Sequence, residues 1–237
     1  MWIDTTYRSR ETEIMDDFNM EGPMLKETLV KIDQINRRLG GNDVTINGVL
    51  QLLRELPADQ MVTIMDAGCG SGEMLRQLAD TAKKINRRFR LIGVDANATT
   101  IGFAKELSVS YPDIEYYCED IMSEWFEKQQ PDIILGTLTL HHFPEEEVKT
   151  LLRLFLRQAR VGIVINDLQR SALAYRLFSL LCIVFNWNRM VRTDGKISIL
   201  RGFKKKELEQ LAASLQINHY SVKWKWAFRY QWIIKNL

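Results

Sequence analysis

Apolar residues in the first quarter of the chain recur at helical spacing. Over residues 25–39 they lie three or four positions apart, which predicts an amphipathic helix. A Gly-Gly pair ends this helix, and the apolar positions at 49–56 predict a second helix that stops before a proline. Because both helices precede the first strand pattern, we expect residues 1–60 to form a helical lid over the rest of the fold.

From residue 61 onward, short apolar runs typical of buried strands alternate with amphipathic stretches typical of helices. Strict alternation of this kind predicts a parallel sheet with helices on both faces. The predicted strands are 62–65, 90–94, 114–118, 132–136 and 161–165. The predicted helices between them are 73–83, 99–110 and 145–158.

The C-terminal part of the chain has a different pattern. Two strand-like segments, 217–226 and 229–235, are so close in sequence that an antiparallel hairpin is expected. The expected fold class is α/β: a Rossmann-like, seven-stranded, mostly parallel sheet with a C-terminal antiparallel hairpin and an N-terminal helical lid. We expect two units, the lid at 1–60 and a domain at 61–237.

The most apolar stretch of the chain lies at 172–187. It is shorter than the ~20 apolar residues that span a bilayer, and Arg176 lies inside it, so no transmembrane segment is expected. The stretch is expected to be a helix that walls an apolar pocket at the edge of the sheet. The alternative is ordinary core packing or the contact face of a homodimer.

Composition and charge narrow the function classes. A net charge of +2 argues against nucleic acid as the main partner, because phosphate binding needs a concentrated basic face. The three cysteines are far apart, which indicates a reducing compartment without a disulfide framework. The first residues lack the basic stretch and apolar run of a secretory signal, so a cytoplasmic location is expected.

The strongest chemical signal is the sequence Asp-Ala-Gly-Cys-Gly-Ser-Gly at 66–72, directly between a predicted strand and a predicted helix. Alternate glycines let the chain turn tightly and let a ligand approach the backbone without a Cβ in the way. The helix that follows presents unpaired N–H groups to an anionic ligand. Glycine spacing alone is shared by several nucleotide-binding turns and does not name the ligand.

Two further carboxylates follow the next two strands. Asp95 ends the second strand, where a carboxylate can accept the hydroxyl protons of a ribose; capping of the next helix is the alternative. Asp120 follows the third strand, where it can accept from an adenine amino group while Ile121 packs on the ring.

These motifs, together with Leu-Thr-Leu-His-His-Phe at 138–143, stand in the order and spacing of the class I S-adenosylmethionine-dependent methyltransferases, which the chain resembles over roughly residues 60–170. A weaker likeness, at 166–171 and 194–203, is to bacterial methyltransferases of quinones and phenolic polyketides. The resemblance implies S-adenosyl-L-methionine as cofactor, with the glycines on its methionine part. The predicted cofactor-binding residues are Asp66, Ala67, Gly68, Cys69, Gly70, Gly72, Asp95, Ala96, Asp120, Ile121, Thr137 and Leu138.

A nicotinamide-dependent dehydrogenase is the nearest competing function. Its turn reads G-x-G-x-x-G, whereas this chain has G-x-G-x-G followed by a glutamate. The histidine pair after the fourth strand also fits the methyltransferase pattern better.

The residues after the fourth strand narrow the methyl acceptor. Residues 136–139 differ from the Asn-Pro-Pro-Tyr turn of enzymes that methylate bases and amides. They also lack the carboxylate that metal-dependent catechol methyltransferases place there, so no catalytic metal is predicted. The expected acceptor is a small hydrophobic or aromatic molecule, with O-methylation of a phenolic or polyketide-like hydroxyl favoured. Carbon methylation in quinone biosynthesis, and cofactor binding without catalysis, remain alternatives.

Deprotonation of a phenol, whose pKa is about 10, calls for a base near neutral pH. His142 and His141 are the candidate bases, because they follow the strand that ends near the reactive methyl group. Capping and packing of the following helix is the alternative role for both. Asp167 is expected to orient the acceptor hydroxyl, and Arg201 to pair with Asp194 or to face an anionic acceptor.

Overall fold

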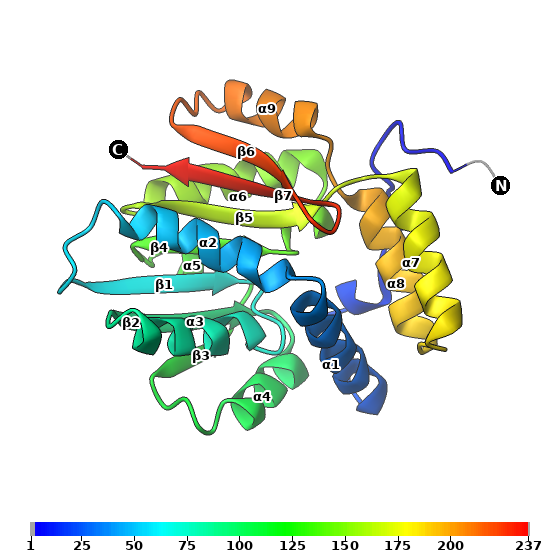
Figure 1. Ribbon diagram of the computed structural model, residues 1–237, viewed down its shortest axis with the longest axis horizontal. Helices are drawn as coiled ribbons and strands as arrows, with labels where there is room; N and C mark the ends of the chain where they lie inside the picture. The colour runs from blue at the N-terminus through cyan, green and yellow to red at the C-terminus, as the bar shows by residue number, and fades with distance from the viewer. Residues whose placement is uncertain (1–2, 237) are drawn as a thin grey trace.

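The structure, a computed structural model, describes residues 3–236, and within them seven strands form one sheet (Figure 1). The sheet order is β3-β2-β1-β4-β5-β7-β6. The strands are β1 (Met61–Ala67), β2 (Arg88–Asp95), β3 (Ile114–Cys118), β4 (Ile133–Thr137), β5 (Gly162–Leu168), β6 (Tyr220–Lys225) and β7 (Arg229–Lys235).

The first five strands are parallel to one another, and β6 and β7 form an antiparallel pair. This arrangement confirms the predicted fold class. β1 lies at the centre between β2 and β4, and β7 pairs antiparallel with both β5 and β6. The order reverses beside β1, and ligands bind at the carboxyl ends of the strands at such a switch point.

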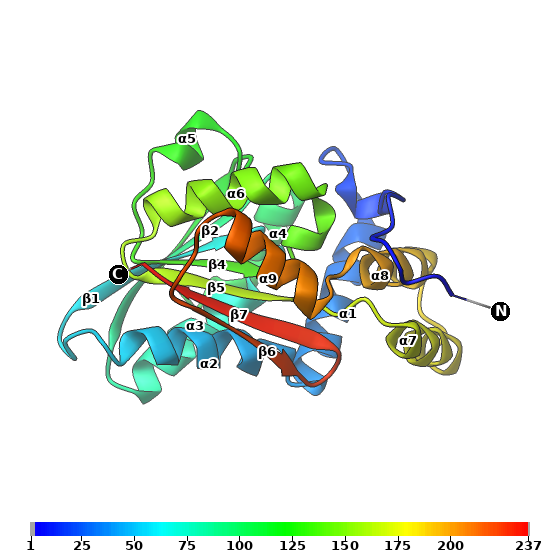
Figure 2. The same ribbon diagram turned by 90° about the horizontal axis from the view of Figure 1, so that it is seen from above.

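Helices cover both faces of the sheet. One face carries α5 (Glu124–Glu127), α6 (Glu145–Gln158) and α9 (Lys205–Ser214). The opposite face carries α2 (Gly41–Leu53), α3 (Glu73–Lys84) and α4 (Ala98–Leu107). Figure 2 shows α6 and α2 on opposite sides of the strands. Buried aliphatic side chains of β1, β4 and β5 pack against both layers, so the centre of the sheet is fully enclosed.

Three more helices gather beyond the carboxyl ends of the parallel strands, on the right of Figure 1. They are α1 (Pro23–Arg38), α7 (Ala172–Val184) and α8 (Arg189–Arg201). The residues before α1 run across this end of the molecule with only one short 3-10 turn, η1 (Ile14–Asp16). Helix α7 matches the apolar stretch at 172–187 that the sequence singled out.

The N-terminal part differs from the predicted lid in two respects. Residues 3–22 are mostly irregular, although the sequence was interpreted as mostly helical there. Helix α2 packs on β5 and β7, with Val49 and Leu52 buried in the core of that face. Of the predicted lid, only the irregular segment and α1, residues 3–40, lie over the strand ends.

Helix α8 is not predicted from the sequence, because Gly195 lies in its middle and glycine is a poor helix former. Gly195 lies where α8 crosses α7, and a Cβ there would come within 2.3 Å of the Phe178 ring. The missing side chain therefore lets the two helices pack closely. No helix within residues 3–236 combines the length and the apolar character required to cross a bilayer.

The packing of α2 on the sheet can be tested with one substitution. A Cβ on Gly48 would lie 2.5 Å from Val164 Cγ1, so Gly48→Ala is expected to lower the free energy of unfolding by about 1–3 kcal/mol. Gly102, on α4, has no atom within 4 Å of its added Cβ in the described part of the chain. Gly102→Ala is therefore the control, and is expected to stabilise by about 0.5–1 kcal/mol. Urea denaturation of both variants measures the difference, and equal effects would contradict the packing.

Candidate active site

A cleft of about 1490 Å³ opens at the carboxyl ends of the parallel strands. Its floor is the turn between β1 and α3 together with the residues that follow β2, β3 and β4. Its walls come from the N-terminal segment, α1, α7 and α8. Leu177, Phe178 and Leu181 of α7 face this cleft, so the helix forms part of its wall as the sequence predicted.

The turn after β1 has the backbone that its glycines predict. Gly68, Gly70 and Gly72 have φ angles of 76°, 54° and 75°, a region that residues with a Cβ rarely adopt. The N–H groups of Gly68 and Cys69 both donate to Val94 O, which fastens the turn to the end of β2. Among residues 3–236, only Leu29 of α1 lies within 4 Å of the added Cβ of Gly70, at 3.9 Å, so the backbone there is open to a ligand.

Two of the predicted cofactor-binding residues do not face the cleft. Within residues 3–236 the cleft lining does not include Ala67 or Gly72. Ala67 is fully buried at the end of β1. A Cβ on Gly72 would lie 2.1 Å from Tyr116 Oη, so this glycine is required for packing behind the turn.

Asp95 faces the cleft and also holds the turn in place. Its Oδ2 accepts from the Gly70 N–H at 3.1 Å and its Oδ1 from the Asn97 N–H at 3.0 Å. Burial raises the pKa of Asp95 above its ordinary value, although both hydrogen bonds oppose this. Capping of α4 belongs to Asn97, whose side chain accepts from Thr100 N–H, so Asp95 is free of the alternative role considered above.

Asp66 is a buried carboxylate beneath the same turn. It is 1% exposed, and its Oδ1 has no hydrogen-bond partner among residues 3–236. Burial raises the pKa of Asp66 well above its usual range, and the nearby Asp95 adds to this. A buried oxygen without a partner is costly unless a ligand supplies a donor.

The remaining predicted cofactor positions lie along the cleft floor. Asp120 is exposed, and its Oδ1 accepts from Met122 N–H, whereas Ile121 is buried with one edge on the cleft. Leu138 has a φ of 56°, which turns the chain sharply after β4, and Thr137 Oγ1 lies 3.0 Å from Thr45 Oγ1. Ala96 and Cys69 complete the floor.

Hydrogen bonds connect the N-terminal segment to this floor. Ser71 Oγ donates to Asp33 Oδ2 at 2.6 Å. Asn97 Nδ2 donates to the carbonyl oxygens of Phe18 and Met20 at 3.0 and 2.7 Å. These hydrogen bonds therefore attach the N-terminal segment to the residues that form the floor of the cleft.

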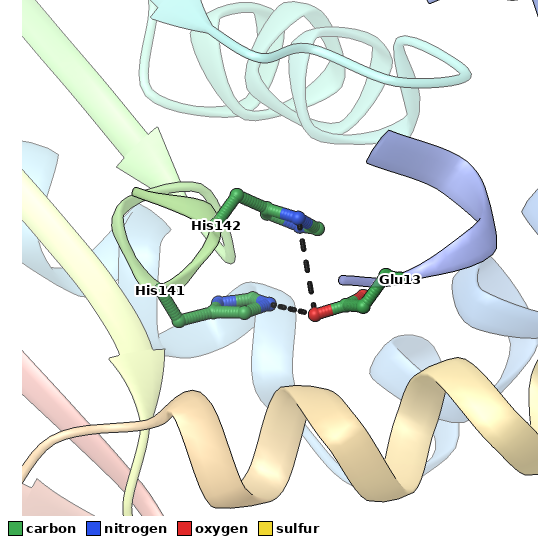
Figure 3. A group of neighbouring side chains, drawn as sticks. All are labelled: Glu13, His141 and His142. Atoms are coloured by element: carbon green, nitrogen blue, oxygen red, sulfur yellow. Dashed lines mark ion pairs between the residues drawn. The ribbon is translucent and has the colours of Figure 1, made fainter. Parts of the chain in front are cut away.

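The histidine pair lies beside this floor, with the two rings 4.2 Å apart (Figure 3). His141 Nδ1 is 2.7 Å from Asp167 Oδ1, and the His141 N–H donates to Asp167 Oδ2. Burial acts to raise the pKa of Asp167, but His141 and the hydrogen bonds outweigh it and lower that pKa. Asp167 is absent from the cleft lining within the described residues, so it orients His141 and cannot contact an acceptor directly.

Two residues that the sequence did not single out, Glu13 and Asp16, join the histidines. Asp16 Oδ1 lies 2.7 Å from His142 Nδ1. Glu13 Oε1 lies 3.7 Å from His141 Nε2 and 3.8 Å from His142 Nδ1, and the Glu13 carboxylate enters from the N-terminal segment (Figure 3). Burial raises the pKa of Glu13 to about 7.

The partners of Arg201 belong to this cluster, and Asp194 is not one of them. Its guanidinium lies 2.5 Å from Asp16 Oδ2 and donates to the backbone carbonyls of His141 and His142. Asp194 accepts from the backbone N–H groups of the 3-10 turn at 14–15. The predicted pairing of Arg201 with Asp194 is therefore wrong, because both residues anchor the N-terminal segment separately.

Comparison with known proteins agrees with this architecture. Residues 64–162 match the family model of a methyltransferase domain. A trans-aconitate 2-methyltransferase from Azoarcus sp. (strain BH72) is 29% identical over 48% of this chain and 41% of its own length. A 2-phytyl-1,4-naphtoquinone methyltransferase from Thermosynechococcus vestitus is 35% identical over 32% of this chain and 31% of its own length. The chain thus aligns with less than half of either relative.

Solved structures share the fold at low sequence identity. The plantazolicin methyltransferase BpumL in complex with SAH has a TM-score of 0.64 at 16% identity, over 91% of this chain and 100% of that chain. The magnesium protoporphyrin IX methyltransferase from Synechocystis PCC 6803 has a TM-score of 0.53 at 14% identity, over 93% and 88%. Residues 64–162 thus match a methyltransferase domain, and the described residues share the fold of methyltransferases solved with S-adenosylhomocysteine or S-adenosylmethionine.

Proposed function

We propose that this chain transfers a methyl group from S-adenosylmethionine to a hydroxyl group of a small aromatic or hydrophobic acceptor. The observation that carries the proposal is that one cleft contains the glycine turn and, beside it, the histidine pair with its carboxylates. The cleft volume of about 1490 Å³ exceeds the roughly 300–1,000 Å³ of single-ligand sites, so a cofactor and an acceptor fit together.

The residues on the floor fit the proposed cofactor. The open backbone at Gly70 admits its methionine part, and Asp66 Oδ1 offers a buried acceptor for a positively charged amino group. Asp95 and Ile121 would hold the ribose and the adenine. When bound, S-adenosylmethionine supplies an activated methyl group with its own leaving group, so the chain must mainly align the acceptor.

The walls of the cleft suit an apolar acceptor with one polar group. Leu25 and Leu29 of α1 and Leu177 and Phe178 of α7 line it. His142 is the partly exposed member of the pair, so it is the proposed contact for the acceptor hydroxyl. His141 and Asp167 are proposed as positioning residues, since both are buried.

Carbon methylation is the second candidate reaction. The 2-phytyl-1,4-naphtoquinone methyltransferase that is 35% identical to part of this chain supports a quinone acceptor, and the same cleft would serve a carbon nucleophile on a quinone ring. Cofactor binding without catalysis is less favoured, because the histidine–carboxylate cluster is present in the cleft.

Turnover against an acceptor panel tests the proposal. The full chain is incubated with S-adenosylmethionine and phenols, quinols or aliphatic acids, and release of S-adenosylhomocysteine is measured. We expect release with phenols or quinols, and a fall of roughly 100-fold or more in kcat for His142→Ala. His219→Ala, at the third and exposed histidine, is the control. Release with the acids alone would refute a hydroxyl acceptor.

A cytoplasmic location and a homodimer stay predictions. Helix α7 leaves Leu173, Leu180 and Ile183 more than half exposed, which is the surface that self-association would bury. Sedimentation velocity of the full chain measures whether it is a monomer or a dimer.

A further inference from the structure

We propose that Glu13, His141 and His142 form a binding site for a divalent transition metal such as Zn²⁺ at the side of the cleft. One ligand atom from each residue lies within 4.8 Å of the other two (Figure 3). The site joins the N-terminal segment to the turn after β4, so no local sequence motif contains it. The proposal does not depend on methyl transfer, and a metal there would give the proposed function a second way to activate a hydroxyl.

The tautomer of His141 leaves one ring nitrogen ready to bind a cation. Asp167 accepts from the backbone N–H groups of both His141 and Leu168, as an ionised carboxylate does. The short contact of its Oδ1 with His141 Nδ1 therefore places the ring proton on Nδ1. His141 Nε2 then carries a lone pair and points at Glu13 Oε1. Histidine ligands of metals are commonly oriented by a carboxylate in this way.

Glu13 presents an oxygen to the same point. Its side chain is 3% exposed, and Oε2 accepts from Ser198 Oγ. Oε1 has no hydrogen-bond partner in the described structure. The buried Glu13 Oε1 and His141 Nε2, 3.7 Å apart, are too far apart for a hydrogen bond. A cation between them would supply the contact that the oxygen lacks.

The third ligand and the local charge complete the site. His142 Nδ1 lies 3.8 Å from Glu13 Oε1 and 2.7 Å from Asp16 Oδ1. By the reasoning used for His141, the contact with Asp16 places a proton on Nδ1, so a metal would replace this proton while Asp16 keeps its contact with Arg201. Three carboxylates, on Glu13, Asp16 and Asp167, surround the histidine pair. Among the described residues, two guanidinium groups lie beside them: Arg201, 3.7 Å from Glu13, and Arg8, which donates to the His141 carbonyl. The surroundings are therefore negative enough to accept a cation.

The ligand set selects the class of metal. Imidazole nitrogens with a carboxylate suit zinc and similar metals, whereas Mg²⁺ and Ca²⁺ prefer oxygen ligands. Two ligands each about 2.1 Å from a tetrahedral metal lie about 3.4 Å apart, so the distances of 3.7 and 3.8 Å need to close only slightly. A fourth position would open into the cleft that these residues line. This arrangement differs from the catechol-type pattern on which the absence of a metal was predicted.

Metal titration of the full chain, with any purification tag removed, tests the site. After treatment with a chelator, we expect one equivalent of Zn²⁺ to bind by calorimetry. Co²⁺ is expected to give the intense visible absorption of a four-coordinate site with nitrogen ligands. Glu13→Gln and His142→Ala should each weaken binding at least tenfold, and Asp167→Asn by about 10–100-fold through loss of His141 orientation. His219→Ala should bind as the unchanged chain does.

Circular dichroism and thermal unfolding show whether each variant is folded. If Glu13→Gln fails to fold, the Co²⁺ spectrum and the stoichiometry of the unchanged chain decide alone. Absence of stoichiometric Zn²⁺ and Co²⁺ binding by the unchanged chain would overturn the proposal. Binding that Glu13→Gln and His142→Ala leave intact would do the same. None of these results depends on the acceptor or on turnover, so failure of the metal site and failure of the proposed function are distinguishable.

Discussion

Asp95→Ala is expected to weaken the binding of S-adenosylhomocysteine about tenfold or more. Two hydrogen bonds from ribose hydroxyls to a charged acceptor contribute up to roughly 1.5–3 kcal/mol each, and 1.4 kcal/mol corresponds to tenfold. Asp95 also accepts from the N–H groups of Gly70 and Asn97, so its loss loosens the turn that receives the cofactor. Calorimetry with the two proteins measures the change in Kd.

Asp113→Ala is the matched control, because Asp113 is an exposed carboxylate on the loop before β3. Its Kd is expected to stay unchanged, and both variants should retain the far-ultraviolet circular dichroism of the unchanged chain. An Asp95→Ala variant that binds as tightly as the control would show that Asp95 only supports the loop.

Binding of S-adenosylhomocysteine is expected to slow amide hydrogen exchange in residues 13–38 by a large factor. These residues cover the cleft and are tied to its floor through the Ser71–Asp33 and Asn97–Met20 hydrogen bonds. A ligand that orders the floor therefore also stabilises the cover, which would exclude water during transfer. Exchange measured with and without ligand gives the effect peptide by peptide.

The second half of α6, residues 151–158, provides the internal control, because it packs on the sheet and is absent from the cleft lining within the described residues. It should exchange equally in both states. Deletion of residues 1–22 should in addition abolish turnover, since it removes Glu13 and Asp16 from the histidine cluster. Identical exchange of residues 13–38 in both states would mean that this segment is only a packing element.

The sheet could be predicted because its pattern is local. Buried parallel strands are continuous apolar runs, and the helices between them carry one apolar stripe each. Helix α6 and strand β7 were predicted with the bounds that the structure has, Glu145–Gln158 and Arg229–Lys235. Strand β3 also has its predicted bounds, Ile114–Cys118. Most other elements differ at their ends by a few residues, because the last hydrogen bond of a strand or a helix does not follow its apolar positions.

Helix α8 and the position of helix α2 were not predicted, because both depend on tertiary packing. Helix α8 contains Gly195, a poor helix former, which is accommodated because Phe178 fills the space that a side chain would take. Helix α2 looks like α1 in sequence, yet Gly48 lets it lie close on the sheet while α1 lies over the strand ends. Amphipathic spacing shows that a helix has a buried face but not which surface buries it.

The contrast between local pattern and tertiary packing also applies to the site. The shared position of the turn at 66–72, Asp95 and Asp120 along the cleft could be predicted, because each lies at or just after the end of a strand and parallel strands bring their ends together. Glu13 and Asp16 could not be predicted, since Asp16 lies 126 residues from the histidine that it contacts. An irregular segment without periodicity carries no signal for such a contact.

Calorimetry of the full chain with S-adenosylhomocysteine and with NAD tests the central claim most directly. The glycine turn, the unpartnered Asp66 oxygen and Asp95 predict one equivalent of S-adenosylhomocysteine bound and no detectable binding of NAD. Tight binding of NAD without binding of S-adenosylhomocysteine would contradict the account and assign the cleft to a dinucleotide.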